Sequence, residues 1–165
     1  MLVEQHHIQT ELRPILMNVF DPEIPVLTIV DMGVVRSAVL ENNVAKIEIT
    51  PTYSGCPAMD VIGDDIKTEF LKFGYQADVK LILAPAWTTD WITDAGRKAM
   101  EVYGIAAPLD AIADKEALLG NKKRVKCTIC KSTNTHLVSQ FGSTACKALF
   151  KCNECQEPFD YFKCL

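Results

Sequence analysis

The last 39 residues of the chain hold two Cys-x-x-Cys pairs, Cys127–Cys130 and Cys152–Cys155, with 21 residues between them. A two-residue gap lets both thiolates of one tight turn face the same ion. Two such turns, brought together by a hairpin, supply the four soft ligands that zinc prefers. A segment this short builds too small a core to fold without a metal or disulfides. The spacing therefore predicts a zinc ribbon over residues 124–165, with strands near 136–140 and 147–151.

The identity of the metal and the use of two further cysteines are less constrained by the spacing. Four cysteines leave no open coordination position, so the predicted role is structural, and zinc is favoured. A rubredoxin-like iron, or a cluster that also uses Cys146 or Cys164, could use the same ligands. We interpret Cys146 and Cys164 as small buried hydrophobic residues. The alternative for these two thiols is a second metal site or a role in cluster transfer.

Charge and cysteine are divided unevenly along the chain. Residues 1–110 carry 8 Lys+Arg against 16 Asp+Glu, whereas residues 111–165 carry 9 against 5, and six of the seven cysteines lie in the second part. This split predicts two domains, 1–104 and 124–165, joined by a linker over 105–123. The start of the chain lacks a signal peptide and no run of 18 apolar residues occurs, so we expect a cytoplasmic protein that does not enter a membrane. In that compartment a metal is favoured over disulfides.

Hydrophobic periodicity in the first domain alternates between helical and strand patterns. Two consecutive strands joined by a turn at Glu41-Asn42-Asn43 read as a hairpin. A strand, a helix and a further strand imply a parallel pairing with a right-handed crossover. The order predicts an α/β fold, a small α-β-β-α-β-α sandwich with a mixed sheet. The predicted elements are helix 4–19, strands 34–40 and 44–50, a helix that begins after Cys56 and ends at Gly74, strand 77–83, and a helix capped by Thr88, Thr89 or Asp90 that ends at Gly104.

Cys56 is the only cysteine before residue 127. It follows a strand and precedes a helix, so we place it at the helix N-cap, where the helix dipole is expected to lower the pKa of its thiol. Simple space filling is the alternative. No histidine is placed to form a Cys-His nucleophile, and no phosphate-binding glycine motif occurs, so we do not expect catalysis by this chain alone. The predicted supporting groups are Asp21, Glu23, Asp31, Thr50 and Thr52, and the three acids could also be ordinary solvated loop carboxylates.

Several longer segments resemble known families. Residues 21–27, 31–35 and 50–57 resemble the small iron–sulfur assembly domain of SufT-like proteins and of the cytosolic iron–sulfur targeting complex. Residues 84–92, 141–150 and 157–164 look like the PaaD (PaaJ) family, the D components of bacterial phenylacetyl-CoA 1,2-epoxidase systems in aerobic phenylacetate degradation. The resemblance covers the chain from about Asp21 to Leu165. One departure is Lys131, where many ribbons have glycine after the first cysteine pair.

The resemblance implies an accessory role in maturation of the epoxidase system, by assembly or delivery of a transient iron–sulfur cluster to the iron–sulfur flavoprotein reductase. It implies Cys56 as the cluster ligand and Cys127, Cys130, Cys152 and Cys155 as the ribbon ligands. A single thiolate cannot hold a cluster alone, so a homodimer or a partner chain would supply the rest. The alternative is a structural subunit of the oxygenase complex. A zinc-ribbon regulator that binds nucleic acid is a third hypothesis, but the tail is only weakly basic and we expect no such binding.

Overall fold

The computed structural model describes residues 6–109, 116–119 and 125–163. The chain divides into two compact units, Met1–Gly96 and Arg97–Leu165. Among the helices of the described residues, none has the length and apolar character needed to span a bilayer.

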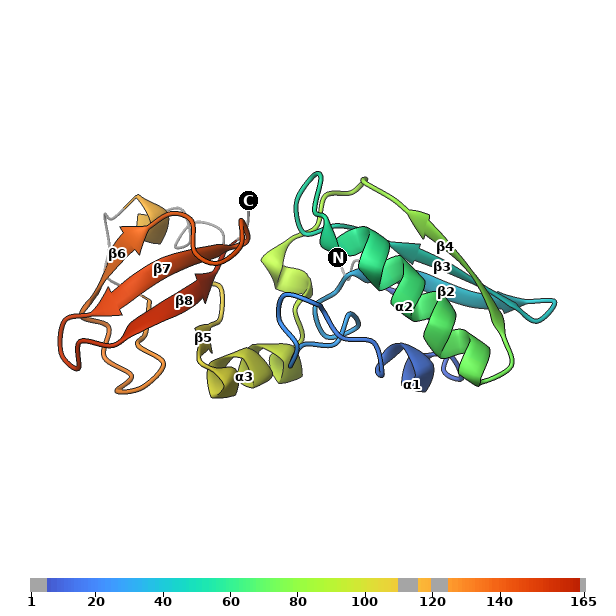
Figure 1. Cartoon of the computed structure of the whole chain (residues 1–165), viewed down its shortest axis with the longest axis horizontal. Coiled ribbons are helices and arrows are strands. Elements are labelled where there is room, and N and C mark those ends of the chain that lie inside the picture. The colour runs from blue at the N-terminus through green and yellow to red at the C-terminus, as the bar shows by residue number, and fades with distance from the viewer. Residues whose placement is uncertain (1–5, 110–115, 120–124, 164–165) are drawn as a thin grey trace, which may run out of the picture. The chain divides into compact units, whose positions relative to one another are not determined.

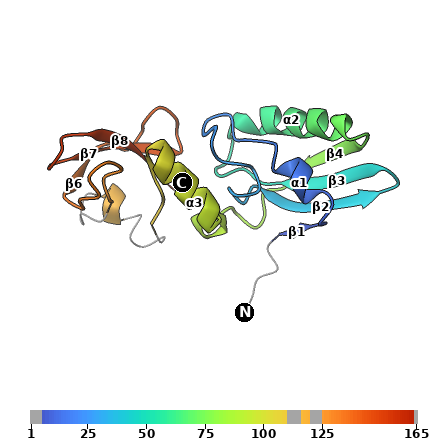
Figure 2. The same ribbon diagram turned by 90° about the horizontal axis from the view of Figure 1, so that it is seen from below.

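The first unit is built on one mixed four-stranded sheet with the order β1-β2-β3-β4. Strands β2 and β3 pair antiparallel as the predicted hairpin, whereas β1 pairs parallel with β2 and β4 pairs parallel with β3. Helix α2 lies across one face of this sheet (Figures 1 and 2). The predicted mixed α/β fold is therefore confirmed. The elements are β1 His7–Ile8, α1 Arg13–Leu16, β2 Val35–Glu41, β3 Val44–Ile49, α2 Ala58–Lys72, β4 Gln76–Leu81 and the short 3-10 helix η1 Thr89–Trp91.

The core of this unit follows from two periodicities. Helix α2 buries Ile62, Ile66 and Phe70, which recur at helical spacing. Strand β3 buries alternate residues, including Ile47 and Ile49, as expected for a strand with one covered face. Burial of each such side chain contributes about 1.5–3 kcal/mol. This packing fixes the start of α2, and with it the loop that carries Cys56.

The predicted helix over residues 4–19 is wrong in extent. His7 and Ile8 form β1, and within 6–19, the part of that range that the structure describes, only Arg13–Leu16 is α-helical. The Gln9 side chain accepts a hydrogen bond from the backbone N–H of Leu40 at 2.7 Å, which holds this segment against the sheet. Tertiary pairing with β2 thus overrides the helical spacing of the apolar residues, and Pro14 lies in the first turn of the short helix, where its missing N–H costs least.

The second unit begins earlier than the predicted domain boundary. Helix α3 (Asp94–Tyr103) spans the division after Gly96, and β5 (Ile105–Ala106) pairs parallel with β8. Part of the predicted 105–123 linker is therefore sheet, and Ala106 and Ala117 of that range are buried in the ribbon core. Residues 110–115 and 120–124 of that predicted linker lie outside the described residues.

The ribbon sheet has the order β5-β8-β7-β6. Strands β6 (Thr135–Ser139) and β7 (Lys147–Cys152) form the predicted antiparallel hairpin, and β8 (Pro158–Phe162) adds to it antiparallel. Phe150, Phe159 and Tyr161 form the centre of a small core that also contains Cys127 and Cys152. Two of the four predicted metal ligands, Cys127 and Cys152, are thus part of the hydrophobic core of the ribbon.

Candidate functional site

The four cysteines of the two Cys-x-x-Cys pairs converge in the ribbon. Their sulfur atoms all lie within 4.8 Å of one another. The Cys127 and Cys155 sulfurs are 3.6 Å apart, and those of Cys130 and Cys152 are 3.5 Å apart. A tetrahedral zinc with bonds of about 2.3 Å requires sulfurs about 3.8 Å apart, so the four residues fit such an ion.

The two cysteine pairs have matching local structures. In each, the first cysteine accepts a 3.4 Å hydrogen bond from the N–H two residues later, Ile129 to Cys127 and Glu154 to Cys152. The first cysteine of each pair is buried and the second is exposed. Hydrogen bonds from backbone N–H groups favour the thiolate form that binds metal. The ion would therefore be anchored in the core on one side and reach the surface on the other.

Without a cation the two thiols of the second cysteine pair ionise at very different pH. Backbone N–H groups of Cys155 and Glu154 lower the pKa of Cys152 to about 7. The N–H of Glu157 also favours the Cys155 thiolate, but partial desolvation and hydrogen bonds with the thiols of Cys127, Cys130 and Cys152 outweigh it and raise the pKa of Cys155 to about 12. A divalent cation binds the sulfurs as thiolates, because its positive charge replaces that of the protons.

The departure at Lys131 has a structural basis. Lys131 has φ of 60°, and Gln156, which follows the second cysteine pair, has φ of 65°. Both turns therefore require the left-handed region, which explains why glycine is common at this position in ribbons. The Lys131 ammonium donates a 2.9 Å hydrogen bond to the Thr128 carbonyl across its own turn. The non-glycine residue leaves the ligand geometry intact.

Cys56 lies in the loop between β3 and α2 and is half-buried. Its N–H donates to the Tyr53 carbonyl at 3.3 Å, and its own carbonyl accepts from Met59 at 3.4 Å. The N-cap of α2 is Pro57, so the predicted N-cap position for Cys56 is wrong by one residue. The thiol is nevertheless held at the entrance to the helix, and it accepts hydrogen bonds from the backbone N–H of Ala58 and from the Tyr53 side chain.

The predicted lowering of the Cys56 pKa is also wrong. Burial is the largest effect, and it raises the pKa of Cys56 above its ordinary value despite the hydrogen bonds from Ala58 and Tyr53. The negative charges of Glu23 and Asp21 raise it further. The free N–H groups of the helix start are therefore too weak to overcome desolvation and two nearby carboxylates. At neutral pH Cys56 is a neutral thiol.

The three predicted acids lie in different environments. Asp21 and Glu23 are close enough to Cys56 for their charges to act on it. Asp21 also closes a turn, because its Oδ1 accepts hydrogen bonds from the N–H groups of Glu23 and Ile24, each at 2.8 Å. Asp31 instead accepts the hydroxyl hydrogen bonds of Thr28 at 2.9 Å and Thr93 at 2.7 Å. The structure thus gives Asp31 a role in joining two loops, and a role in the site stays a prediction.

The hydroxyl residues before Cys56 differ in access. Thr50 is 1% exposed, and its N–H donates to the Val34 carbonyl, whereas Thr52 is half-buried. Their supporting roles stay predictions. Sequence reasoning did not single out Tyr53, although its side chain forms a hydrogen bond with the Cys56 thiol. Its spacing three residues before Cys56, in a segment with Gly55 and Pro57, is typical of a tight turn and could have indicated the contact.

The extra thiols of the ribbon are only partly described. Cys146 is 2% exposed, and its sulfur lies 3.1 Å from the Thr144 hydroxyl oxygen. It is not one of the four sulfurs gathered for a metal. This placement supports the interpretation as a buried small residue. Cys164 lies outside the described residues.

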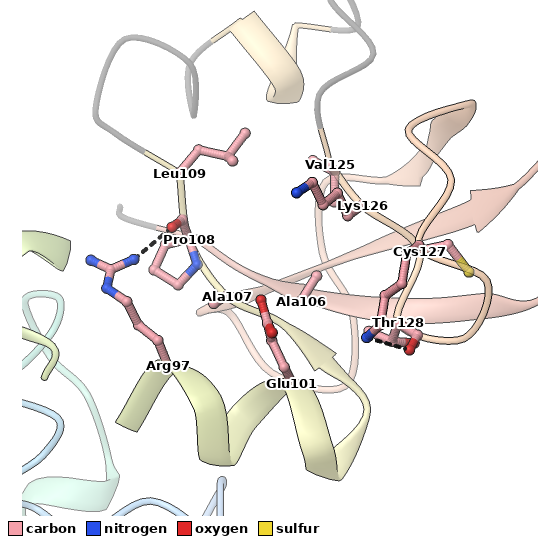
Figure 3. A pocket seen from close by; sticks show the side chains of 11 residues that line it. Arg97, Glu101, Ala106, Ala107, Pro108, Leu109, Val125, Lys126, Cys127 and Thr128 are labelled. Atoms are coloured by element: carbon pink, nitrogen blue, oxygen red, sulfur yellow. Dashed lines mark hydrogen bonds between the residues drawn. The ribbon is translucent and has the colours of Figure 1, made fainter. Parts of the chain in front are cut away.

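A cavity of about 380 Å³ lies in the second unit, beside the first cysteine pair. Figure 3 shows that Arg97 and Glu101 line it from α3, opposite Lys126 and Thr128. Arg97 is already engaged, because its guanidinium donates a 2.7 Å hydrogen bond to the Pro108 carbonyl. The cavity was not predicted from the sequence, and its charged residues come from both sides of the predicted linker.

The raised pKa of Cys56 predicts how the rate of alkylation of its thiol depends on pH. Alkylation by iodoacetamide, followed by mass spectrometry of the peptide that contains Cys56, should have its midpoint above the pH expected for an ordinary cysteine. Glu23→Gln should lower that midpoint, because it removes a negative charge that opposes the thiolate. Glu41→Gln, a change of an exposed acid at the end of β2, should leave it unchanged. A midpoint below the ordinary value would contradict the prediction.

Comparisons with known proteins agree with both halves of the structure. The model of the iron–sulfur cluster assembly protein family matches residues 9–79, and that of the PaaD zinc beta ribbon domain matches residues 111–163. The crystal structure of a DUF59 domain, a domain of unknown function from Bacillus anthracis, is 28% identical with a TM-score of 0.51 and covers 56% of this chain and 90% of its own. The chain thus joins an iron–sulfur assembly domain to a zinc ribbon.

Two curated relatives cover different lengths of the chain. A Porphyromonas gingivalis (strain ATCC BAA-308 / W83) protein named Fe-S protein maturation auxiliary factor is 32% identical over 82 residues, 48% of this chain and 77% of the relative. An Escherichia coli (strain K12) protein, named as the putative D component among the subunits of 1,2-phenylacetyl-CoA epoxidase, is 45% identical over 156 residues, 94% of this chain and 92% of the relative. This near-complete match, with the two family models in the same order, places the chain in the family of D components of phenylacetyl-CoA epoxidase.

Proposed function

We propose that this chain assists the assembly or delivery of an iron–sulfur cluster to the iron–sulfur flavoprotein reductase of a phenylacetyl-CoA epoxidase. Cys56 is the ligand that holds the cluster in transit, and the zinc ribbon is structural. The observation that carries the proposal is a half-buried thiol at the start of α2, in the domain that matches the cluster assembly family. The names of the two relatives support the same direction, one an epoxidase subunit and one a maturation factor.

The chemistry of Cys56 suits temporary binding. Its raised pKa makes the free thiol neutral, so binding of iron must displace a proton. Cysteine binds iron as thiolate, and one thiolate cannot satisfy a cluster. The remaining ligands must come from another chain. A cluster held in this way is released readily to an acceptor that offers a complete set of cysteines.

Cys56→Ser tests this proposal. The epoxidase components are co-expressed with the wild-type chain, with Cys56→Ser, or without the chain, and iron and acid-labile sulfide are measured in the purified reductase. We expect the cluster content with Cys56→Ser to fall to that of cells without the chain. The variant should retain its fold and its zinc, since Cys56 is far in sequence from the ribbon ligands.

Ser54→Ala is the matched control, because Ser54 is an exposed hydroxyl residue of the same loop. It should support a normal cluster content. A normal cluster content with Cys56→Ser would overturn the proposal. The proposal would also be overturned if the reductase from cells with the wild-type chain held no more cluster than the reductase from cells without the chain.

The second candidate is a structural subunit of the oxygenase complex, which the word "subunit" in the name of the relative favours. The ribbon also exposes Ile129 and Phe141, at 65% and 63%. This candidate requires co-purification with the oxygenase at fixed stoichiometry. It further requires full epoxidase activity with Cys56→Ser and loss of activity when the chain is absent.

A further inference from the structure

Strand β4 has an outer edge that no described strand covers. It is the last strand of its sheet and pairs only with β3. The N–H of Gln76 donates to Asn43 at 3.2 Å, and that of Ile82 donates to Ile49 at 2.8 Å. Backbone groups alternate along a strand, so the N–H and C=O groups of the odd-numbered residues point away from β3. Ala77, Val79 and Leu81 therefore present their backbone groups at the edge.

Apolar side chains accompany this edge. Leu81 is 49% exposed, and Leu83, just beyond the strand, is 62% exposed. A groove of about 290 Å³ runs between α2 and β4, and Met59, Val79 and Leu81 line it together with charged residues of the helix. An open edge beside exposed leucines favours pairing with another strand. The question is which strand has the matching chemistry.

The charges of β4 are complementary to those of β4 in a second copy of the chain. Asp78 and Lys80 flank Val79 and are both exposed. In an antiparallel pair of two β4 strands with the two-fold axis through Val79, each Asp78 lies directly opposite Lys80 of the other copy. Val79 then faces Val79 of the other copy, and Ala77 faces Leu81 of the other copy. All the hydrogen-bonded positions therefore fall on residues whose backbone groups point away from β3. Opposite charges on facing residues stabilise such a pair.

Other registers lose this agreement. An axis through Asp78 places the two Asp78 carboxylates opposite each other, and an axis through Lys80 does the same to the ammonium groups. An axis through Ala77 or Leu81 places neither charge opposite its counterpart. Asp78 already binds the Lys46 ammonium at 2.7 Å, and its carboxylate can accept from a second ammonium. The backbone and the charges therefore select the same register.

We propose that the outer edge of β4 is the interface of a homodimer, in which two copies of the sheet join antiparallel about Val79. The partner is a second copy of this chain, because the Asp78-Val79-Lys80 sequence is its own complement. This inference does not depend on Cys56. Failure of one proposal leaves the other standing, since the first is measured by reductase loading and the second by mass in solution.

The test measures mass by sedimentation velocity, with zinc and a reductant present, over a wide range of protein concentration. The wild-type chain should reach twice the mass of the monomer as concentration rises. Lys80→Asp alone and Asp78→Lys alone should remain monomeric, because each places like charges opposite each other. An equal mixture of the two variants should dimerise, since each Lys then faces an Asp of the other chain. Lys98→Asp, an exposed change on α3, is the control and should dimerise as the wild type does.

Ala77→Pro is the second variant, needed if Asp78→Lys fails to fold after losing Lys46. Its missing N–H points away from β3, so the proline removes no hydrogen bond inside the chain and is tolerated at an edge. It should be monomeric with unchanged circular dichroism. A wild-type chain that stays monomeric at every concentration would overturn the proposal. So would dimers of Lys80→Asp or Ala77→Pro, or a wild-type chain that binds only an extended peptide of another protein.

Discussion

Removal of the metal should unfold the ribbon and leave the first unit folded. Structural zinc contributes about 10–16 kcal/mol of apparent binding free energy in small metal domains. Two of the four ligands, Cys127 and Cys152, are fully buried and belong to the same core as Phe150 and Tyr161. Loss of the ion therefore removes the link between the two cysteine pairs, and the remaining core is too small to hold itself together. A strong chelator, or Cys127→Ser, should have this effect.

Segment-resolved hydrogen exchange measures the result directly. Amides of β6, β7 and β8 should lose protection by orders of magnitude, whereas those of β2, β3 and α2 should keep theirs. Cys146→Ser is the matched control, because Cys146 is a buried thiol of the same unit outside the ligand set. It should bind one equivalent of zinc and keep the protection of the ribbon strands. A ribbon that stays protected after chelation would show that the core, and not the ion, stabilises it.

The ribbon was predictable because its determinants are local. Each Cys-x-x-Cys pair fixes two ligands within one turn, and the hairpin between the pairs is set by the alternation of β6 and β7. The mixed sheet was likewise predictable from strand and helix periodicity. The extent of the first helix was not. There the side chain of Gln9 and the residues His7–Ile8 bind to β2, which begins about 30 residues later, and this pairing prevents the helix from starting earlier.

Cys56 shows where sequence reasoning about a site fails. The position near a helix start could be derived from Gly55 and Pro57, but the pKa depends on burial and on Asp21 and Glu23, more than 30 residues earlier in the chain. Only the folded chain sets the balance between desolvation and the helix N–H groups. The same applies to Asp31, whose partner Thr93 is 62 residues away. The roles of these residues in cluster transfer stay predictions.

Gly33→Ala should strongly destabilise the first unit. Gly33 has φ of +74°, and a Cβ there would lie 2.6 Å from both the Cβ and the carbonyl oxygen of Trp91. Trp91 cannot move aside easily, because it is 8% exposed and the Arg36 guanidinium lies 4.0 Å from its ring centroid. Left-handed strain of about 1–2 kcal/mol adds to about 1–3 kcal/mol for overpacking, so a loss of about 2–5 kcal/mol is expected.

Gly55→Ala separates the two effects. Gly55 has nearly the same φ, +79°, but nothing lies within 4 Å of the position of its Cβ. The substitution therefore carries only the left-handed strain, about 1–2 kcal/mol. Denaturant unfolding followed by tryptophan fluorescence measures both variants, because Trp87 and Trp91 are the only tryptophans and both lie in the first unit. Equal losses of stability for the two variants would mean that the Trp91 backbone yields, and that the close approach to Gly33 does not constrain this fold.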